Sequence, residues 1–232
     1  MNKEIKLIDL GLLDYKKAWD FQEKLFQEII EIKKINRKKS TNLKTPNYLV
    51  FVEHPNVFTM GKNGDLSNLL VSEQKIREKN ASFYKINRGG DITFHGPGQI
   101  VGYPILDLEN FFTDIHKYLR MLEEVIILTL KKYQINALRN KGNTGVWLDI
   151  STGQSKKICA MGVRASRWVT MHGFALNVNI DLDFFKLINP CGLVNSDVTS
   201  MNKELNQDKI NVNEVKGYIK KNFQNIFGCN FI

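Results

Sequence analysis

The 232 residues include 33 Lys and Arg against 24 Asp and Glu, which gives a net charge of +9, and 43% of the residues are hydrophobic. This ordinary composition argues against a disordered or fibrous chain, and the length suits one domain over residues 1–232. No signal peptide is recognisable, and no apolar run reaches the roughly 18 residues of a membrane span, so we expect a cytoplasmic protein.

The first half of the chain alternates between helical and strand patterns. Apolar residues spaced three and four apart predict a helix over 14–33, and a basic loop follows over 36–47. Short β-branched and aromatic runs predict strands at 48–52 and 56–61. A short helix is expected over 72–80, with the serine at its start as the cap.

From residue 83 to 108 the pattern indicates a strand, a tight turn and a strand. The remaining expected elements are a helix over 114–133, strands at 145–150, 157–163 and 172–178, a helical turn at 182–187, a loop at 189–192 and a closing helix over 212–227 with a glycine just past its end. The order of these elements predicts an α+β fold in which helices cover a mixed or antiparallel sheet.

The segment from Arg88 to Tyr103 is the most unusual in the chain, with five glycines and a proline among sixteen residues. Such glycine density lets the backbone approach a ligand, and Arg88, Thr93, His95 and Gln99 would add a cation and polar contacts. From composition alone, a structural hairpin is at least as good an interpretation. The spacing matches neither phosphate-binding glycine motif.

Three cysteines are too few for a disulfide framework and none has zinc-ligand spacing, so each is a candidate nucleophile. Cys191 follows Asn-Pro and precedes a glycine, which suits a rigid turn with an accessible amide. Cys159 is the rival, because it shares a strand face with Lys157 at a spacing of two. For Cys159 and Cys229, a buried inert thiol is the favoured interpretation.

Three ordered blocks resemble one enzyme family. The 88–103 segment, then Lys157-Ile-Cys-Ala-Met-Gly162 with His172-Gly-Phe-Ala-Leu-Asn-Val178, then Ile188-Asn-Pro-Cys-Gly192, are similar to the motifs of octanoyl-[acyl-carrier-protein]:protein octanoyltransferases. The resemblance runs from about residue 54 to residue 192. It implies the fold of biotin and lipoate protein ligases and a covalent acyl-enzyme.

The resemblance also assigns roles. It makes Cys191 the nucleophile and Lys157 its activator. Met161 and Phe174, with Cys159, would tune the preferred acyl length. The implied acyl-pocket walls are Arg88, Gly89, Gly90, Asp91, Ile92, Thr93, Phe94, His95, Ala160, Met161, Gly162, Gly173, Phe174 and Ala175. The residues that would orient this pocket or the lysine are Gln99, Tyr103, His172 and Asn177.

The chemistry suits these residue types. A thiolate attacks a thioester and forms another of similar energy, so the acyl group stays activated between a large donor and a large acceptor. A free thiol is mostly protonated at neutral pH, and Lys157 would correct this either as an ammonium that stabilises the thiolate or as a neutral base. The sequence does not choose between the two.

The positive charge suits acyl carrier protein, which is acidic and carries phosphopantetheine. The resemblance implies a second partner, the lipoyl domains of 2-oxoacid dehydrogenases and of the glycine cleavage system, and it implies no ATP. Four scattered histidines predict no metal, with His54 and His116 structural or exposed. Arg164 and Arg167 are expected to meet the carrier or simply to lie on the surface, and Lys156 to face solvent.

Two alternatives remain open. An ATP-dependent lipoate or biotin protein ligase would share the fold but would not need a loop cysteine at position 191. A non-catalytic basic module that binds nucleic acid or carrier protein would explain the charge. The aromatic residues lie in core patterns and are not interleaved with lysines, so no stacking platform for nucleic acid is evident.

Overall fold

The computed structural model describes residues 1–189 and 197–232. Within these residues, nine strands form one mixed sheet in the order β12-β1-β2-β6-β10-β9-β8-β7, with β11 beside β9. The strands are β1 (Glu4–Leu12), β2 (Tyr48–Glu53), β6 (Gln99–Ile105), β7 (Leu138–Asn140), β8 (Asn143–Leu148), β9 (Lys156–Ser166), β10 (Val169–Asn177), β11 (Asp197–Val198) and β12 (Asn230–Phe231). Neighbours pair antiparallel except for β1 with β2 and β12, and β11 with β9. The predicted α+β fold with a mixed sheet is confirmed.

A smaller sheet packs beside the large one in the order β4-β3-β5. It consists of β3 (Val57–Met60), β4 (Ser82–Lys85) and β5 (Ile92–His95). Because β5 pairs with β3 while β6 pairs with β2 and β10, the turn at 96–98 carries the chain from one sheet to the other. The tight turn predicted between these strands is therefore not a hairpin.

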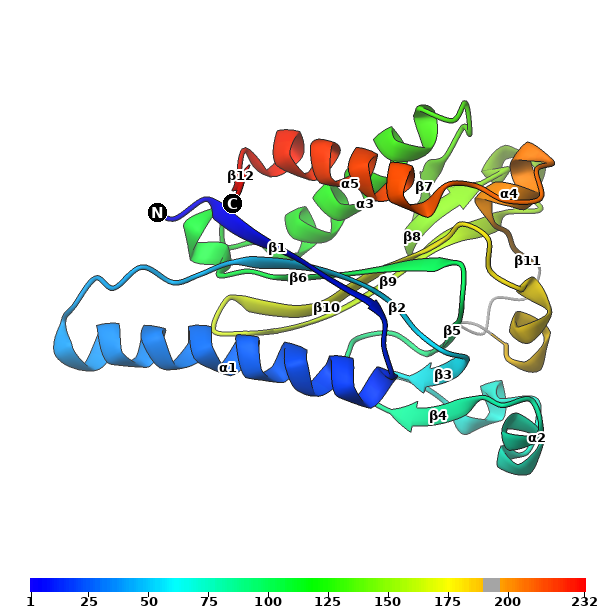
Figure 1. Cartoon of the computed structure of the whole chain (residues 1–232), viewed down its shortest axis with the longest axis horizontal. Helices are drawn as coiled ribbons and strands as arrows, with labels where there is room; N and C mark the ends of the chain where they lie inside the picture. Colours follow the sequence, from blue (N-terminus) through cyan, green and yellow to red (C-terminus); the bar gives the residue numbers. More distant parts are fainter. Residues whose placement is uncertain (190–196) are drawn as a thin grey trace.

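Helices cover both faces of the large sheet (Figure 1). The described helices are α1 (Tyr15–Lys39), α2 (Glu73–Glu78), α3 (Ile115–Lys131), α4 (Met201–Leu205) and α5 (Val212–Phe227), with 3₁₀ turns at Leu66–Asn68, Leu108–Asn110, Ile150–Thr152 and Leu182–Leu187. Of these, α2 packs against β4 of the small sheet (Figure 1). Helix α1 buries one apolar stripe, including Phe26, Ile29 and Ile30, against one face. Among the described residues, no helix combines the length and apolar content needed to cross a bilayer.

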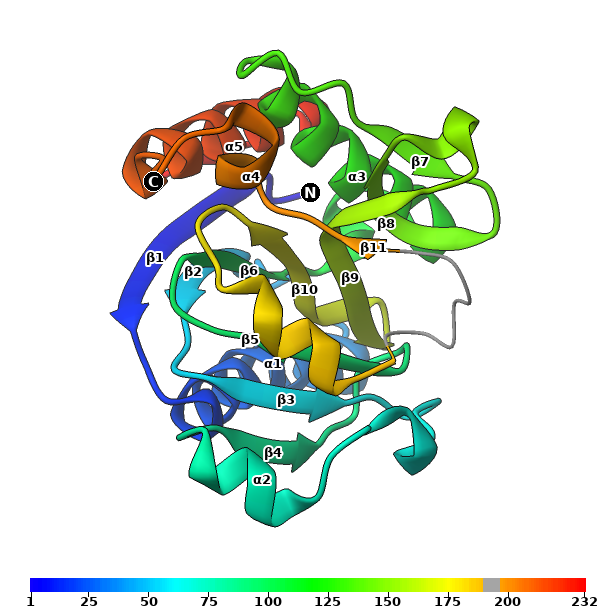
Figure 2. The same ribbon diagram turned by 90° about the vertical axis from the view of Figure 1, so that its right-hand side faces the viewer.

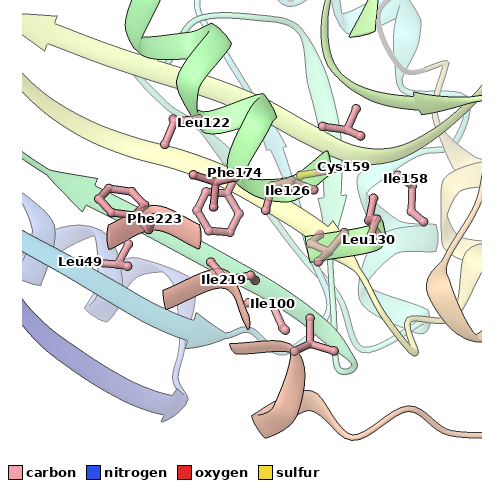
Figure 3. Packing of buried hydrophobic residues seen from close by; sticks show 14 of the residues in the cluster. Leu49, Ile100, Leu122, Ile126, Leu130, Ile158, Cys159, Phe174, Ile219 and Phe223 are labelled. Carbon is pink, nitrogen blue, oxygen red and sulfur yellow. The ribbon is translucent and has the colours of Figure 1, made fainter. Parts of the chain in front are cut away.

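Helices α3 and α5 lie side by side on the opposite face, over the largest core cluster. Leu122, Ile126 and Phe223 are fully buried there, and Figure 3 shows them around Phe174 and Cys159 of the sheet. Burying each such side chain contributes about 1.5–3 kcal/mol, so this cluster fixes the β9–β10 pair from behind. The predicted closing helix over 212–227 is confirmed, and Gly228 caps it in the left-handed conformation.

Two sequence expectations differ from the structure. Helix α1 continues to Lys39, through what was expected to be the start of a basic loop, because lysines and arginines favour helix and suit the negative end of its dipole. The N-terminal residues, whose sequence pattern predicts no element, form β1 beside β2. Its apolar residues are interrupted by charges because one edge of the sheet and part of one face remain exposed.

Candidate functional site

A cavity of about 460 Å³ opens between the two sheets. Its walls come from β9 and β10 of the large sheet, from β5 and the glycine-rich segment before it, and from the first residue of α1. In Figure 2, β3 and β4 of the small sheet lie below β9 and β10 of the large sheet. The described residues that were assigned to the acyl pocket, the activator and the orienting set all line this cavity except Phe94.

Phe94 points away because successive side chains of a strand lie on opposite faces. Thr93 and His95 of β5 reach the cavity, whereas Phe94 stacks on Phe184 at 4.6 Å between ring centroids in a separate core cluster. Its packing supports the small sheet from behind, so Phe94 does not form part of the wall.

Glycine is required where the 88–91 turn meets β9. The Gly89 N–H donates to the Val163 carbonyl at 2.9 Å, and a Cβ on Gly162 would lie 2.8 Å from the Gly89 oxygen. Arg88 reaches back into the small sheet, where its Nη2 donates to the Thr59 carbonyl at 2.7 Å and to the Thr59 hydroxyl at 3.0 Å. The turn therefore closes onto the strand, and Arg88 anchors it.

Asp91 organises the neighbouring loop. Its carboxylate accepts from the backbone N–H of Ile92 at 2.7 Å and of Asp65 at 3.2 Å, and from the Asn68 side chain at 2.5 Å. These bonds tie the turn to residues 65–68, whose far end contacts the last described residues before position 190. The polar side chain of Asp91 is thus engaged with the protein.

Lys157 and Cys159 do not share a strand face. Val146 of β8 pairs with Cys159 while Trp147 pairs with Lys157, so a bulge leaves one extra residue of β9 between them. Lys157 lines the cavity, with its Nζ 4.5 Å from the centroid of the Trp147 ring. Cys159 is fully buried in the main core, and burial raises the pKa of its thiol far above the ordinary value.

Cys191, the predicted nucleophile, lies outside the described residues. The residues on either side of the undescribed range are bonded to the rest of the structure. The Asn189 N–H donates to the Asn68 carbonyl at 2.7 Å, and β11 pairs with β9 so that Asp197 lies opposite Lys156 and Val198 opposite Lys157. Val198 also lines the cavity.

The other cationic candidates are engaged by carboxylates. Lys156, which was expected to face solvent, is partly exposed and does not line the cavity, and its Nζ lies 2.8 Å from Asp149 and 3.6 Å from Glu204. The Arg164 guanidinium bonds Glu23 of α1 at 2.9 Å and packs over the Phe26 ring. Both residues therefore hold elements of the fold together.

Buried neutral histidines support the inner end of the cavity. His54 donates from Nδ1 to the Leu13 carbonyl and accepts at Nε2 from the Tyr103 hydroxyl, each at 2.8 Å. Burial lowers the pKa of His54 to about 4 and that of His95 to about 3, the latter also lowered by the nearby His54. His172, which is 2% exposed, has a pKa lowered to about 3 by burial and by Arg88.

His172 also has an unusual backbone. The β6–β10 register, from Phe174 opposite Gly102 to the bridge between Val169 and Asp107, places Pro104 opposite His172. Proline donates no backbone hydrogen bond, and His172 adopts a φ of 59° and donates its N–H to Gln22 of α1 at 3.0 Å. The strand is thus fastened to α1 where its ladder to β6 is interrupted.

These histidines predict a stability loss in mild acid. Their pKa values in the folded state lie below the unfolded value of about 6.5, so the unfolded chain binds protons that the folded chain does not. The unfolding free energy, from urea titrations, should therefore be highest above pH 6.5 and fall toward pH 5 by about 1.4 kcal/mol per pH unit for each buried histidine. His95→Gln should reduce that slope and His116→Gln, on an exposed helix position, should not. A constant unfolding free energy from pH 7 to pH 5 would contradict the assignment.

Several cavity residues carried no recognisable sequence signal. Tyr15, the first residue of α1, is 2% exposed and its ring stacks on His95 with centroids 5.9 Å apart. Asn143 and Thr144 of β8, Ile115 and Leu119 of α3, and Phe185 of the 182–187 turn also line the cavity. Tyr15 is far from the glycine-rich segment in sequence, and only the packing of α1 against the sheets brings it there.

No metal centre is formed by the described residues, since no group of three His, Cys, Asp or Glu side chains converges among them. The cavity instead offers glycine-lined backbone, an apolar wall from Val101 and Ala175, and the side chain of Lys157. Such a cleft suits a slender apolar chain with its reactive end beside an amine.

Comparison with known proteins agrees with this description. The lipoyl protein ligase A/B catalytic domain model matches residues 14–224. The octanoyltransferase of Flavobacterium psychrophilum is 63% identical over 232 residues, covering 100% of both chains, and that of Christiangramia forsetii is 61% identical over 227 residues, covering 98% of this chain and 97% of the other. A bipartite lipoate protein ligase from Thermoplasma acidophilum, solved in work that also covers its E2 lipoyl domain, has the same fold, with a TM-score of 0.73 at 15% identity over 100% of this chain and 86% of that one.

Proposed function

We propose a specific route for a chain that belongs to the lipoyl protein ligase A/B catalytic-domain family and is an acyltransferase of octanoyl groups. It takes the octanoyl group from acyl carrier protein, holds it as a thioester on Cys191, and passes it to a lysine of a lipoyl domain. The observation that carries the proposal is that Lys157 lines the cavity opposite Val198 of β11, directly after the segment that contains Cys191. No cofactor is part of this scheme.

The acyl group would lie along the glycine-lined wall. Ala160 and Gly162 of β9 and Gly173 of β10 line the cavity, and Val101 with Ala175 offers an apolar surface. Binding an apolar chain there removes its surface from water, which contributes about 0.8 kcal/mol for each buried methylene. The carbonyl end would remain near Lys157.

Two steps then follow. In the first, the Cys191 thiolate attacks the donor thioester, the carbonyl–sulfur bond of the donor breaks, and the phosphopantetheine thiol leaves with a proton. In the second, the neutral amine of the acceptor lysine attacks the enzyme thioester, an amide forms, and the Cys191 thiol is regenerated. Lys157 supports both steps by stabilising a thiolate or by moving the proton.

Intact-mass measurement tests the proposal. Mixing the chain with octanoyl-acyl carrier protein, in the absence of ATP, should add the mass of one octanoyl group, and hydroxylamine should remove it because it cleaves thioesters. Adding an unacylated lipoyl domain should transfer that mass to the domain. Transfer that requires ATP and leaves no adduct on the chain would instead identify a ligase.

A further inference from the structure

A continuous line of side-chain hydrogen bonds runs beneath the cavity, from Arg88 to the segment beside Lys157. The Thr59 hydroxyl lies 3.0 Å from Arg88 Nη2 and 3.3 Å from His95 Nε2. His95 Nδ1 lies 2.7 Å from Gln99 Oε1. Gln99 Nε2 then lies 2.8 Å from Asn177 Oδ1.

The last member of the line is a backbone group. Asn177 Nδ2 lies 2.9 Å from the Thr199 carbonyl oxygen, and the Thr199 N–H donates to the Lys157 carbonyl at 3.0 Å. His95, Gln99, Asn177 and Thr199 are each at most 6% exposed. The line thus connects two parts of the site that lie on different sheets.

The groups at the two ends of this line determine which atom donates and which accepts in every hydrogen bond between them. A backbone carbonyl only accepts, so Asn177 must present its amide nitrogen to Thr199 and its oxygen to Gln99. Gln99 in turn must present its oxygen to His95, which places the proton of His95 on Nδ1. At the other end a guanidinium only donates, so the Thr59 hydroxyl accepts from Arg88 and donates to His95 Nε2.

Asn177 is the member that acts nearest to Lys157. Thr199 directly follows β11, which spans Asp197–Val198. Its carbonyl accepts a hydrogen bond from Asn177, and its N–H donates one to the Lys157 carbonyl. Without the Asn177 donor, the buried Thr199 carbonyl would lose its amide partner, and β11 would lose one of its ties to the core of the large sheet. The backbone bonds from Asp197 to Ser155 and from Thr199 to Lys157 would remain, together with the pairing of β11 with β9.

We propose that Asn177, held in orientation by Gln99, is a positioning residue for acyl transfer, which fixes the Thr199 carbonyl and thereby the placement of β11 against Lys157. This inference rests on the proposed function and deepens it. Asn177 acts through Thr199 on the geometry around Lys157, so it affects the rate of the acylation step more than the binding of the donor.

The substitution Asn177→Asp tests this with nearly unchanged shape. When its carboxyl is protonated, the new residue donates to the Thr199 carbonyl and still accepts from Gln99. When it ionises, an oxygen without a proton faces the Thr199 carbonyl and repels it. Burial raises the pKa of such a carboxyl above its usual range, so the change should fall within the pH range of the assay.

Single-turnover acylation by octanoyl-acyl carrier protein is the measurement, followed by intact mass from pH 6 to pH 8. The native rate should rise with pH as the thiol ionises. The rate of the Asn177→Asp variant relative to the native rate should fall by about tenfold or more over the same range, with KM for the donor within about twofold. The titratable groups nearest the new carboxyl are neutral His95, which Gln99 separates from it, and Lys157 and Glu204, which both bond Thr199, with Lys156 beside Glu204. Arg88 lies further along the line, beyond Thr59.

Asn179→Asp is the matched control. Asn179 lies two residues further along and bonds Ile210 through both side-chain atoms, at 2.8 and 2.9 Å, without lining the cavity. Its variant should keep the native pH profile. Equal profiles for native protein and Asn177→Asp, or the same loss in both variants, would overturn the positioning role. Absence of any adduct on the native protein would instead overturn the proposed function.

Discussion

Octanoyl transfer is expected to fall by at least ~10³-fold when Cys191 is replaced by alanine, because removal of a nucleophile leaves only binding and polar stabilisation. The mass adduct should disappear at the same time. Cys159→Ala and Cys229→Ala provide matched controls, since each also removes one thiol from the same chain. Their thiols are 0% and 2% exposed.

The two control thiols are chemically inert for a physical reason. Burial raises the pKa of Cys229 to about 11 and that of Cys159 further still, so neither forms a thiolate at neutral pH. Both control variants should therefore retain the adduct and lose only some stability from the space left in the core. An adduct that survives in Cys191→Ala, or that disappears in Cys159→Ala, would refute the assignment of the nucleophile.

Replacement of Lys157 by methionine should slow acylation by about 10²–10⁴-fold, the usual contribution of a positioned acid or base. Methionine keeps most of the side-chain length, so its packing over the Trp147 ring should survive. Lys156→Met is the control, because that side chain bonds Asp149 and Glu204 and does not line the cavity. It should keep a near-native rate.

The same variants distinguish the two roles of the amine. Lys157→Arg retains a cation but cannot act as a base at neutral pH. If Lys157 stabilises the thiolate, alkylation of Cys191 by iodoacetamide should keep its native pH profile in Lys157→Arg and shift to higher pH in Lys157→Met. If Lys157 moves the proton, both variants should lose acylation alike. Native acylation rates in Lys157→Met would exclude both roles.

Local patterns in the sequence predicted the parts of the fold that depend on local chemistry. The apolar spacing indicated helix 212–227 with its correct bounds, and Asp114 caps the helix that was expected to begin there. Strand β1 could not be predicted from local patterns, because its stability comes from pairing with residues 48–53, which are distant in sequence. The chain likewise passes from one sheet to the other at 96–98 because β5 and β6 pair with different strands, and a glycine-rich turn does not specify those pairings.

The candidate site divides in the same way. Most residues taken from the motif segments line one cavity, because a motif records a fixed local conformation. The bulge in β9 could not be read from the sequence, since a spacing of two placed Lys157 and Cys159 on one face and the pairing with β8 separates them. Tyr15 and the line from Arg88 to Thr199 depend on contacts between residues that are distant in sequence.

The hydrogen bonds of His95 have a consequence for the chemistry. Both ring nitrogens are occupied, one giving a proton to an amide oxygen and the other receiving one from an alcohol. To carry a proton to or from a substrate, the ring would have to release these neighbours, and the amides beyond it would have to turn over. An imidazole held in this way does not exchange protons with a bound substrate, so His95 has a structural role in the cavity wall and no part in acid–base catalysis.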